Sequence, residues 1–277
     1  MSASESEKIG KPSEPGEYDE GMLAMLQIIW GDGFLSPGGA DEVARVFEGS
    51  DISGCEVLDI GCGLGAVDEL LVTQYRASSV VGVDIDPVLL QGLRVRAERA
   101  GLASRMRGVK VQPGPLPFAA ASFDVVFSKD SLVQIPDKPA IFAEILRVLR
   151  PGGRFIASDW LRGGSGDYSA EMLEFFRLEG IAYNMATLGE SAAALRCAGF
   201  VDVEIRDRHA WYLELAQHEL QAMEGELEPM IVGRIGASRA RHFLDNWRQL
   251  VVVLDRGELR PGHLKAAKPS VAQEYCG

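Results

Sequence analysis

Short apolar runs alternate with longer amphipathic stretches between residues 55 and 159. Each run is typical of a buried strand, and each is followed by apolar residues at helical spacing. Strands that alternate with helices in this way indicate a parallel sheet with right-handed crossovers. The expected strands are residues 55–60, 79–84, 109–112, 123–128 and 154–159.

After residue 159 the pattern loosens, and longer helical stretches dominate it. We expect one α/β domain with a Rossmann-like, seven-stranded, mostly parallel sheet whose last strand is antiparallel. A helical insert at about 209–257 should cover the carboxyl edge of the sheet, where ligands bind in such folds. The other expected elements are helices at 168–180, 189–198, 214–232 and 238–256 and strands at 201–206 and 263–267.

Two predicted helices precede the first strand. Residues 1–16 are mostly Ser, Glu, Pro and Gly and cannot bury enough apolar surface to offset chain entropy, so they are predicted to be a disordered tail. Residues 17–31 predict an apolar helix that ends at a glycine, and a second helix is expected near 40–48.

Charge and the rarer residue types exclude several classes of protein. The formal net charge is −12 and no cluster of Lys and Arg occurs, which disfavours a nucleic-acid partner. No apolar run is long enough to span a membrane, and the N-terminus lacks the apolar centre of a signal peptide. The four cysteines are scattered and the four histidines form no pair. We therefore expect a cytoplasmic protein with no metal site and a small-molecule partner.

A glycine-rich turn follows the first strand, in the sequence Val57-Leu-Asp-Ile-Gly-Cys-Gly-Leu-Gly65. Its glycines permit a tight turn and let a ligand approach the backbone beside a helix N-terminus. Gly61, Gly63 and Ala66 also satisfy the dinucleotide-binding pattern, and Asp84 lies where that fold places its ribose-binding acid. The turn by itself therefore leaves an NAD(P)-dependent oxidoreductase open.

Three further features favour a different cofactor. Asp59, two residues before the first glycine, would oppose a pyrophosphate but suits the α-ammonium of a methionine moiety. The fourth strand ends in Ser128-Lys-Asp130, and Arg150-Pro-Gly-Gly153 introduces the fifth. This ordered set, spread over residues 52–160, resembles the class I S-adenosylmethionine-dependent methyltransferases. The resemblance implies that S-adenosylmethionine is the cofactor.

The resemblance also implies a role for individual residues. The three glycines of the turn would line the methionine end of the cofactor, and Asp84 would accept both ribose hydroxyls. Gln112 stands where the family has an aspartate that binds the adenine amine, and its carbonyl can accept the same bond. The cofactor-binding residues expected in this way are Ser36, Gly38, Asp59, Gly61, Gly63, Gly65, Asp84, Ile85, Gln112, Leu116 and Ser128.

The sequence before the first strand is similar to that of phosphoethanolamine N-methyltransferases. The similarity begins with Tyr18, Ile29-Trp-Gly31 and Leu35-Ser-Pro-Gly-Gly39, and it continues through Ser128–Gln134 and Tyr183. In that family the N-terminal segment folds over the cofactor, so residues 17–50 are expected to be a lid and residues 51–277 the methyltransferase domain.

The acceptor end departs from that family at two positions. The family's tyrosine and aspartate match Tyr18 and Asp130, but its histidine position is Gln134, and an amide cannot act as a base near neutral pH. Its phosphate-binding lysine falls on Leu250. We therefore expect N-methylation of a small amine other than phosphoethanolamine. The alternatives are S-methylation of a thioether amino acid such as methionine, an NAD(P)-dependent oxidoreductase, and a cofactor-binding protein without catalysis.

The candidate residues for the acceptor follow from the same resemblance. Tyr18, Asp130 and Gln134 are expected to be catalytic, and Tyr183, Trp30 and His209 to bind substrate. Packing explains a tyrosine or tryptophan equally well at these positions, and a surface role explains the histidine.

Overall fold

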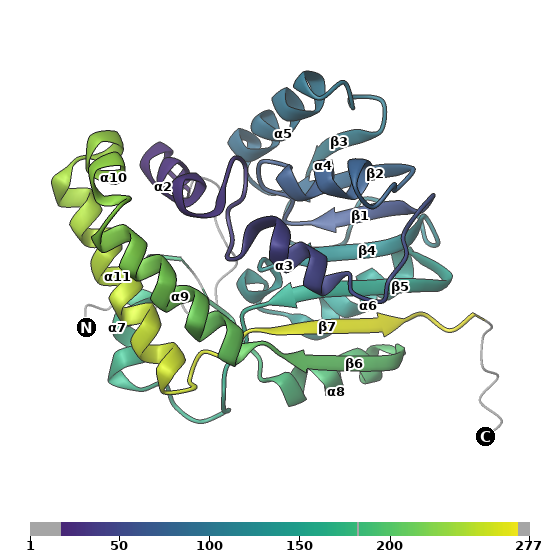
Figure 1. Cartoon of the computed structure of the whole chain (residues 1–277). Coiled ribbons are helices and arrows are strands. Elements are labelled where there is room, and N and C mark those ends of the chain that lie inside the picture. The colour runs from purple at the N-terminus through teal and green to yellow at the C-terminus, as the bar shows by residue number, and fades with distance from the viewer. Residues whose placement is uncertain (1–17, 182, 271–277) are drawn as a thin grey trace.

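A seven-stranded sheet forms the centre of the molecule (Figure 1). The computed structural model describes residues 18–181 and 183–270. The strands are β1 (Glu56–Ile60), β2 (Ser79–Asp84), β3 (Met106–Lys110), β4 (Phe123–Lys129), β5 (Leu149–Asp159), β6 (Val201–Asp207) and β7 (Gly262–Ala267). Their order is β3-β2-β1-β4-β5-β7-β6, and β7 is antiparallel to both of its neighbours while the other pairs are parallel. The predicted seven-stranded α/β fold is confirmed, and the tail predicted for residues 1–16 lies outside the described residues.

Helices cover both faces of the sheet because neighbouring residues of a strand point to opposite faces. The helices are α2 (Glu20–Trp30), α3 (Gly39–Val46), α4 (Ala66–Thr73), α5 (Pro87–Arg99), α6 (Lys138–Val148), α7 (Ala170–Glu179), α8 (Leu188–Ala198), α9 (His209–Glu224), α10 (Glu228–Ile235) and α11 (Ala237–Asp255), with one 3₁₀ turn, η1 (Leu132–Gln134). Val57 and Val125 belong to a buried cluster with α3, α4 and α5. Leu58 and Val126 belong to a second cluster with α6 and α8. The sheet is therefore the middle layer of three.

Two strands begin earlier in the chain than the sequence pattern predicts. The third spans Met106–Lys110 rather than 109–112, because its pairing with β2 buries Met106. It is an edge strand, so only one neighbour fixes its ends. The fifth strand begins at Leu149, which pairs with Phe123 before the register shifts.

The helical insert contains one helix more than the sequence pattern predicts. Instead of one helix over 214–232, α9 ends at Glu224 and α10 begins at Glu228. Gly225 lies between them, and Pro229 occupies the first turn of α10, where a missing N–H costs little. Inside a continuous helix the same proline would remove a hydrogen bond and clash with the preceding turn.

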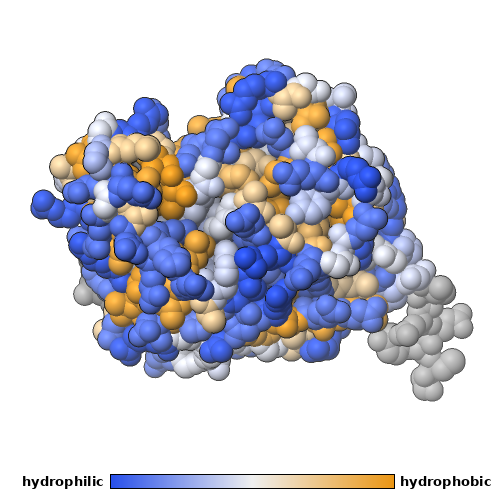
Figure 2. Space-filling view, in the orientation of Figure 1, coloured by the Kyte–Doolittle hydropathy of each residue, from blue (hydrophilic) through white to orange (hydrophobic). Residues whose placement is uncertain are grey.

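A layer of helices lies beyond the carboxyl ends of the parallel strands. The arrowheads of β1 and β5 point toward it in Figure 1. Helices α2, α7, α9, α10 and α11 share one buried apolar cluster there. Figure 2 shows that the outline of the molecule is indented between this layer and the α5 side of the sheet. No helix in the described part of the chain combines the length and the apolar character needed to cross a bilayer.

A buried ion network joins the N-terminal helices to the end of the sheet. Glu42 of α3 is fully buried and accepts hydrogen bonds from Arg208 at 3.1 and 2.7 Å. His263 of β7 lies 2.6 Å from the same carboxylate. Burial alone would raise the pKa of Glu42, but His263 and Arg208 hold it below its usual range. The network therefore fixes α3 to β7 and to the start of α9.

Candidate functional site

A cavity of about 600 Å³ lies at the carboxyl ends of β1, β2 and β4. We call it the main cavity. The strand order reverses direction between β1 and β4, and open α/β sheets bind their ligands at such a point. Its volume is in the usual range for sites that hold drug-sized ligands and cofactors. The position and the size of the cavity therefore fit a cofactor site.

The glycine-rich turn forms one wall of the main cavity. Gly61 has a φ of 79°, and a Cβ there would lie 2.3 Å from the side chain of Ser131. Gly63 has a φ of 52° and also lines the cavity. Gly65 is outside the lining: it precedes α4 and lets that helix approach Leu93 and Met106. Two glycines thus shape the cavity, and the third allows close packing.

Asp59 is a buried carboxylate that lines the main cavity. The residue is only 2% exposed, and its Oδ1 has no hydrogen-bond partner among the described residues. Burial, together with the charges of Asp68 and Asp84, raises the pKa of Asp59 far above its usual range. An unpaired buried acceptor is costly, so Asp59 is suited to a ligand that donates a hydrogen bond or carries a positive charge.

Asp84 lies at the end of β2 and also lines the main cavity. Its Oδ2 accepts a hydrogen bond from the Gly63 amide at 3.1 Å, and its Oδ1 accepts one from the Asp86 amide at 3.0 Å. Burial raises the pKa of Asp84 although these amides lower it. Each carboxylate oxygen can accept a second bond, so a pair of ligand hydroxyls can bind here.

The remaining predicted cofactor residues are divided between the cavity and the packed interior. Ile85, Gln112, Leu116 and Ser36 line the main cavity. Ser128 does not, because its buried hydroxyl donates to the carbonyl of Ile60 at 2.9 Å. Gly38 is outside the lining too, and a Cβ there would lie 2.4 Å from the ring of Trp211.

The main cavity is acidic. Its only cationic lining residue within the described part of the chain is Lys129, which is bound to Asp130. A pyrophosphate would meet carboxylates on several sides, which disfavours a dinucleotide, whereas a cationic ligand is attracted. The acidic lining residues are Asp59, Asp84, Asp130, Asp137 and Glu144. No three His, Cys, Asp or Glu side chains in residues 18–181 and 183–270 are grouped so as to hold a metal ion.

A second, smaller cavity of about 50 Å³ continues toward the helical layer. We call it the aromatic cavity. The residues that line both cavities are Tyr18, Leu35, Ser36, Asp130 and Gln134. Among the described residues that line it there is no Lys, Arg or His. Its aromatic lining residues are Tyr18, Trp30, Trp160, Tyr183, Phe243 and Trp247.

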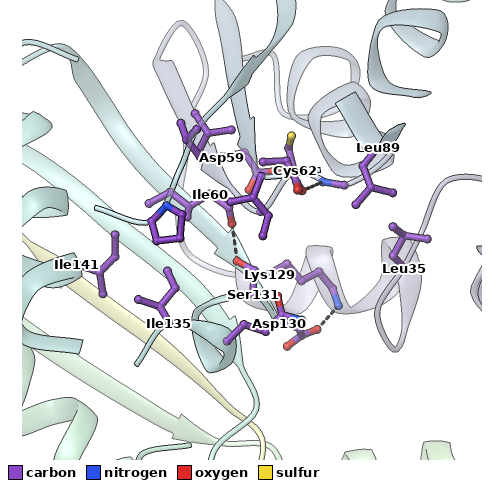
Figure 3. Close-up of a pocket in the computed structure, with 18 of the residues that line it drawn as sticks. Leu35, Asp59, Ile60, Cys62, Leu89, Lys129, Asp130, Ser131, Ile135 and Ile141 are labelled. Atoms are coloured by element: carbon purple, nitrogen blue, oxygen red, sulfur yellow. Dashed lines mark hydrogen bonds and ion pairs between the residues drawn. The ribbon is translucent and has the colours of Figure 1, made fainter. Parts of the chain in front are cut away.

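Asp130 lies where the two cavities meet. It follows β4 with a φ of 55°, a left-handed conformation that aspartate adopts more readily than most residues. Its side chain is only 2% exposed and binds Lys129 at 2.7 Å (Figure 3). It also accepts a hydrogen bond from the Ser158 hydroxyl at 3.1 Å. Lys129 also donates to the Ser36 hydroxyl at 2.8 Å. The bonds of Lys129 therefore connect the loop before α3 to the end of β4 and to Asp130.

The structure brings five of the six predicted acceptor residues to the aromatic cavity. Tyr18, Asp130, Gln134, Trp30 and Tyr183 all line it. His209 does not reach either cavity, because its Nε2 lies 2.6 Å from the carbonyl oxygen of Leu254. The histidine is thus part of the contact between α9 and α11, and its expected contact with substrate is corrected.

Sequence reasoning missed three polar residues around the aromatic cavity. Glu179 and Asn246 line it, and Glu219 lies behind its tryptophans. Glu219 accepts hydrogen bonds from the indole of Trp30 at 2.7 Å and from that of Trp247 at 3.1 Å. The only local signal for Glu179 and Glu219 was an acidic residue on a predicted helix, and such residues usually lie on the solvent-exposed face. The long sequence separation of the partners hides such contacts.

Glu219 is expected to make stability depend on pH. Burial raises its pKa to about 7 from 4.5, although the two indole hydrogen bonds oppose the shift. The folded chain then holds a proton that the unfolded chain loses, so the free energy of unfolding should fall by up to about 3 kcal/mol as the pH rises from about 5 to about 7.5. The free energy of unfolding of Glu219→Gln should fall less over this range. The remaining dependence comes from other carboxyl groups whose pKa burial raises, among them Asp68 and Asp159, each to about 7.

Urea unfolding at a series of pH values measures this difference. Glu214→Gln, an exposed change on the same helix, is the matched control and should follow the unmodified chain. A Glu219→Gln curve parallel to that of the unmodified chain would show that Glu219 is ionised in the folded state throughout.

Sequence similarity connects the chain to known methyltransferases. The family described as "Methyltransferase domain" matches residues 58–157. Methyltransferase GfsG of Streptomyces halstedii is 30% identical over 209 residues, which cover 70% of this chain and 75% of that protein. The chain belongs to the methyltransferase family. The enzyme class predicted from the glycine-rich turn and its neighbours is thereby confirmed, against the oxidoreductase alternative.

Other similar proteins are named phosphoethanolamine N-methyltransferases. Phosphoethanolamine N-methyltransferase 1 of Arabidopsis thaliana is 30% identical over 216 residues, which cover 78% of this methyltransferase but 43% of that protein. A structure of Haemonchus contortus phosphoethanolamine N-methyltransferase 2, in complex with phosphomonomethylethanolamine and S-adenosylhomocysteine, matches with a TM-score of 0.84 at 23% identity. That match covers 92% of this methyltransferase and 59% of the other chain. The methyltransferase thus spans about half the length of these relatives and shares their fold.

Proposed function

We propose that this methyltransferase transfers a methyl group from S-adenosylmethionine to the nitrogen of a small amine that carries no phosphate. The observation that carries the proposal is the chemistry of the aromatic cavity. Carboxylates of Asp130 and Glu179 and several aromatic rings line it, and no Lys, Arg or His does so among the described residues. Such a lining suits a cation and offers a phosphate no positively charged partner.

The main cavity supports S-adenosylmethionine as the donor. The unpaired oxygen of Asp59 suits the ammonium of the methionine moiety, and Asp84 suits the two ribose hydroxyls. Ile85, Gln112 and Leu116 offer apolar contact and an amide for the adenine. The cofactor is cationic at its sulfur and at its ammonium, which fits the acidic lining.

The residues at the junction of the cavities would align the acceptor. S-adenosylmethionine supplies a methyl group that is already activated on a positively charged sulfur. Asp130 lines both cavities, so its carboxylate can hold an amine against the main cavity. The rings of Trp30 and Trp247, with centroids 5.7 Å apart, can stabilise a cationic product through cation–π contact. Gln134 cannot take a proton, which favours a tertiary amine, because its free base has no N–H proton to lose after the methyl transfer.

The position of Leu250 supports an acceptor without phosphate. The residue is 6% exposed and lines the aromatic cavity at the place where the resemblance to phosphobase enzymes puts a lysine. A phosphate in this cavity would find no cationic side chain in the described lining, and the nearby Lys129 is already paired with Asp130. Burying a charge without a partner is costly.

We also propose that the segment before β1 is a lid, as its similarity to the phosphobase enzymes suggests. Tyr18 and Leu35 line both cavities, and Trp30 of α2 lines the aromatic cavity. Lys129 holds Ser36 and the carbonyl of Pro37 at 2.8 and 2.9 Å. The segment therefore covers the sheet edge from the side of the helical layer.

A thioether sulfur is the second candidate acceptor. The observation that favours it is Gln134, because a thioether has no proton to lose and needs no base. Its methylated product is a sulfonium, which the same rings and carboxylates would stabilise.

Transfer of radiolabelled methyl groups tests the proposal. The purified chain is incubated with labelled S-adenosylmethionine and separate panels of short primary, secondary and tertiary amines, thioethers, and phosphorylated amines. We expect label in an amine without phosphate, with tertiary amines the best acceptors. Label confined to thioethers would show that the methylated atom is sulfur and not nitrogen. Label confined to phosphorylated amines would refute the proposal.

The role of Asp84 can be measured without an acceptor. Asp84→Ala should weaken the binding of S-adenosylhomocysteine by about 10- to 100-fold, because hydrogen bonds to a charged group contribute about 1.5–3 kcal/mol. Isothermal titration calorimetry gives the affinity. Asp255→Ala, an exposed change outside both cavities, is the control. Equal affinities for the two variants would remove Asp84 from the cofactor site.

A further inference from the structure

The aromatic cavity contains a polar group that alignment of the methylated atom does not use. Glu179, at the end of α7, accepts hydrogen bonds from the Asn246 side-chain amide of α11 and from the Tyr183 hydroxyl. All three residues line the aromatic cavity and none lines the main cavity. They therefore lie away from Asp130, which borders both.

One atom of this group is left without a partner. The Asn246 amide nitrogen faces Glu179 and donates to its carboxyl group. Its Oδ1 is then turned away from Glu179, and it is buried with no hydrogen-bond partner among the described residues, in a residue that is 4% exposed. Buried polar atoms are nearly always hydrogen-bonded in folded proteins, so this oxygen indicates a ligand that donates to it.

The two available acceptors select one kind of chemical group. A carboxylate oxygen of Glu179 and Oδ1 of Asn246 both accept hydrogen bonds, and no donor side chain of Lys, Arg or His accompanies them in the described lining. Burial raises the pKa of Glu179, and an anionic group beside it would find no cationic partner in the described lining. An apolar group would leave Oδ1 of Asn246 unsatisfied.

We propose that Glu179 and Asn246 bind a second functional group of the acceptor, a hydrogen-bond donor such as an ammonium or a hydroxyl, at the end remote from the methylated atom. The acceptor is then a short bifunctional amine, with its reacting nitrogen beside Asp130 and its other end on Glu179. This inference rests on the proposed function for the identity of the cavity. The small volume of the aromatic cavity, about 50 Å³, limits the chain between the two groups to a few atoms.

Equilibrium binding tests the inference independently of turnover. The chain is saturated with S-adenosylhomocysteine and titrated with short amines that differ only at the far end, which is an ammonium, a hydroxyl, a methyl, a carboxylate or a phosphate. We expect the ammonium and hydroxyl compounds to bind at least about tenfold more tightly than the methyl compound, and the two anionic compounds most weakly.

Two variants locate the preference. Glu179→Gln keeps the shape and removes the carboxyl group, whose ionised form a bound ammonium would favour, so the preference for ammonium over methyl should fall at least about fivefold. Glu174→Gln, an exposed change on the same helix, should keep the preference of the unmodified chain. Three results would overturn the inference: equal binding of all five compounds, no binding of any of them, or an unchanged preference in Glu179→Gln. The first two are measured on the unmodified chain and do not depend on the folding of a variant.

The binding series and the labelling experiment fail in different ways. If the compounds bind with the expected preference but accept no methyl group, the donor-binding site at Glu179 and Asn246 stands and the proposed function falls. If methyl groups are transferred to amines without any preference at the far end, the proposed function stands and the inference falls.

Discussion

Asp130→Asn is expected to lower kcat/KM for the acceptor by about 100-fold or more, while the affinity for S-adenosylhomocysteine changes only a few-fold. The carboxylate lies at the junction of the two cavities and is held by Lys129 and Ser158. Asparagine preserves its shape but removes the charge that would orient the amine, and the loss of one preorganised electrostatic group in an active site costs about 10²–10³ in rate.

Steady-state kinetics with the best acceptor, together with calorimetry, separates this role from a structural one. Asp130 also pairs with buried Lys129, so thermal unfolding must show that Asp130→Asn is folded at the assay temperature. Asp41→Asn, an exposed change in the first turn of α3, is the matched control. If Asp130→Asn and the control have the same kcat/KM, Asp130 supports the fold and does not hold the acceptor.

Glu42→Ala is expected to lower the free energy of unfolding by about 3–5 kcal/mol. The change removes the carboxylate that Arg208 and His263 share. Both side chains are buried, with exposures of 8% for Arg208 and 2% for His263. Uncompensated buried charge is one of the largest single causes of destabilisation. Because the network joins α3 to β7 and α9, the loss should also loosen the proposed lid.

Urea unfolding at neutral pH measures the effect. Glu48→Ala is the control, since that glutamate pairs with Arg206 on the surface with side-chain exposures of 69% and 54%. Surface ion pairs contribute little, so this control should unfold close to the unmodified chain. If the two variants unfold together, the buried network does not hold the N-terminal helices to the sheet.

The sheet and the placement of Asp59, Gly61 and Asp84 at its carboxyl edge were predictable because their signals are local. A strand, a glycine-rich turn and a helix follow one another within Val57–Thr73, and the next strand ends at Asp84. The turn geometry requires glycine at Gly61, where a side chain would meet Ser131. Pairing between consecutive parallel strands then brings Asp59 and Asp84 to one edge. Each step depends on residues that are close in the sequence.

The acceptor side was predictable only where it resembles a known family. Trp30 and Glu219 are 189 residues apart, and Glu179 and Asn246 are 67 residues apart. These contacts depend on how α2, α7, α9 and α11 pack, and helical periodicity does not determine that packing. The pattern showed an apolar face on each helix but not which buried carboxylate would meet which indole. The misplaced His209 has the same origin, because its partner is a backbone carbonyl on another helix.

The most direct test of the account compares one short tertiary amino alcohol with its phosphate monoester as methyl acceptors. Both are incubated with labelled S-adenosylmethionine under identical conditions, and the initial rates of label incorporation are measured. Because the aromatic cavity offers a buried phosphate no cationic partner, we expect the amino alcohol to be methylated about 100-fold faster. Faster methylation of the phosphate monoester would contradict the account.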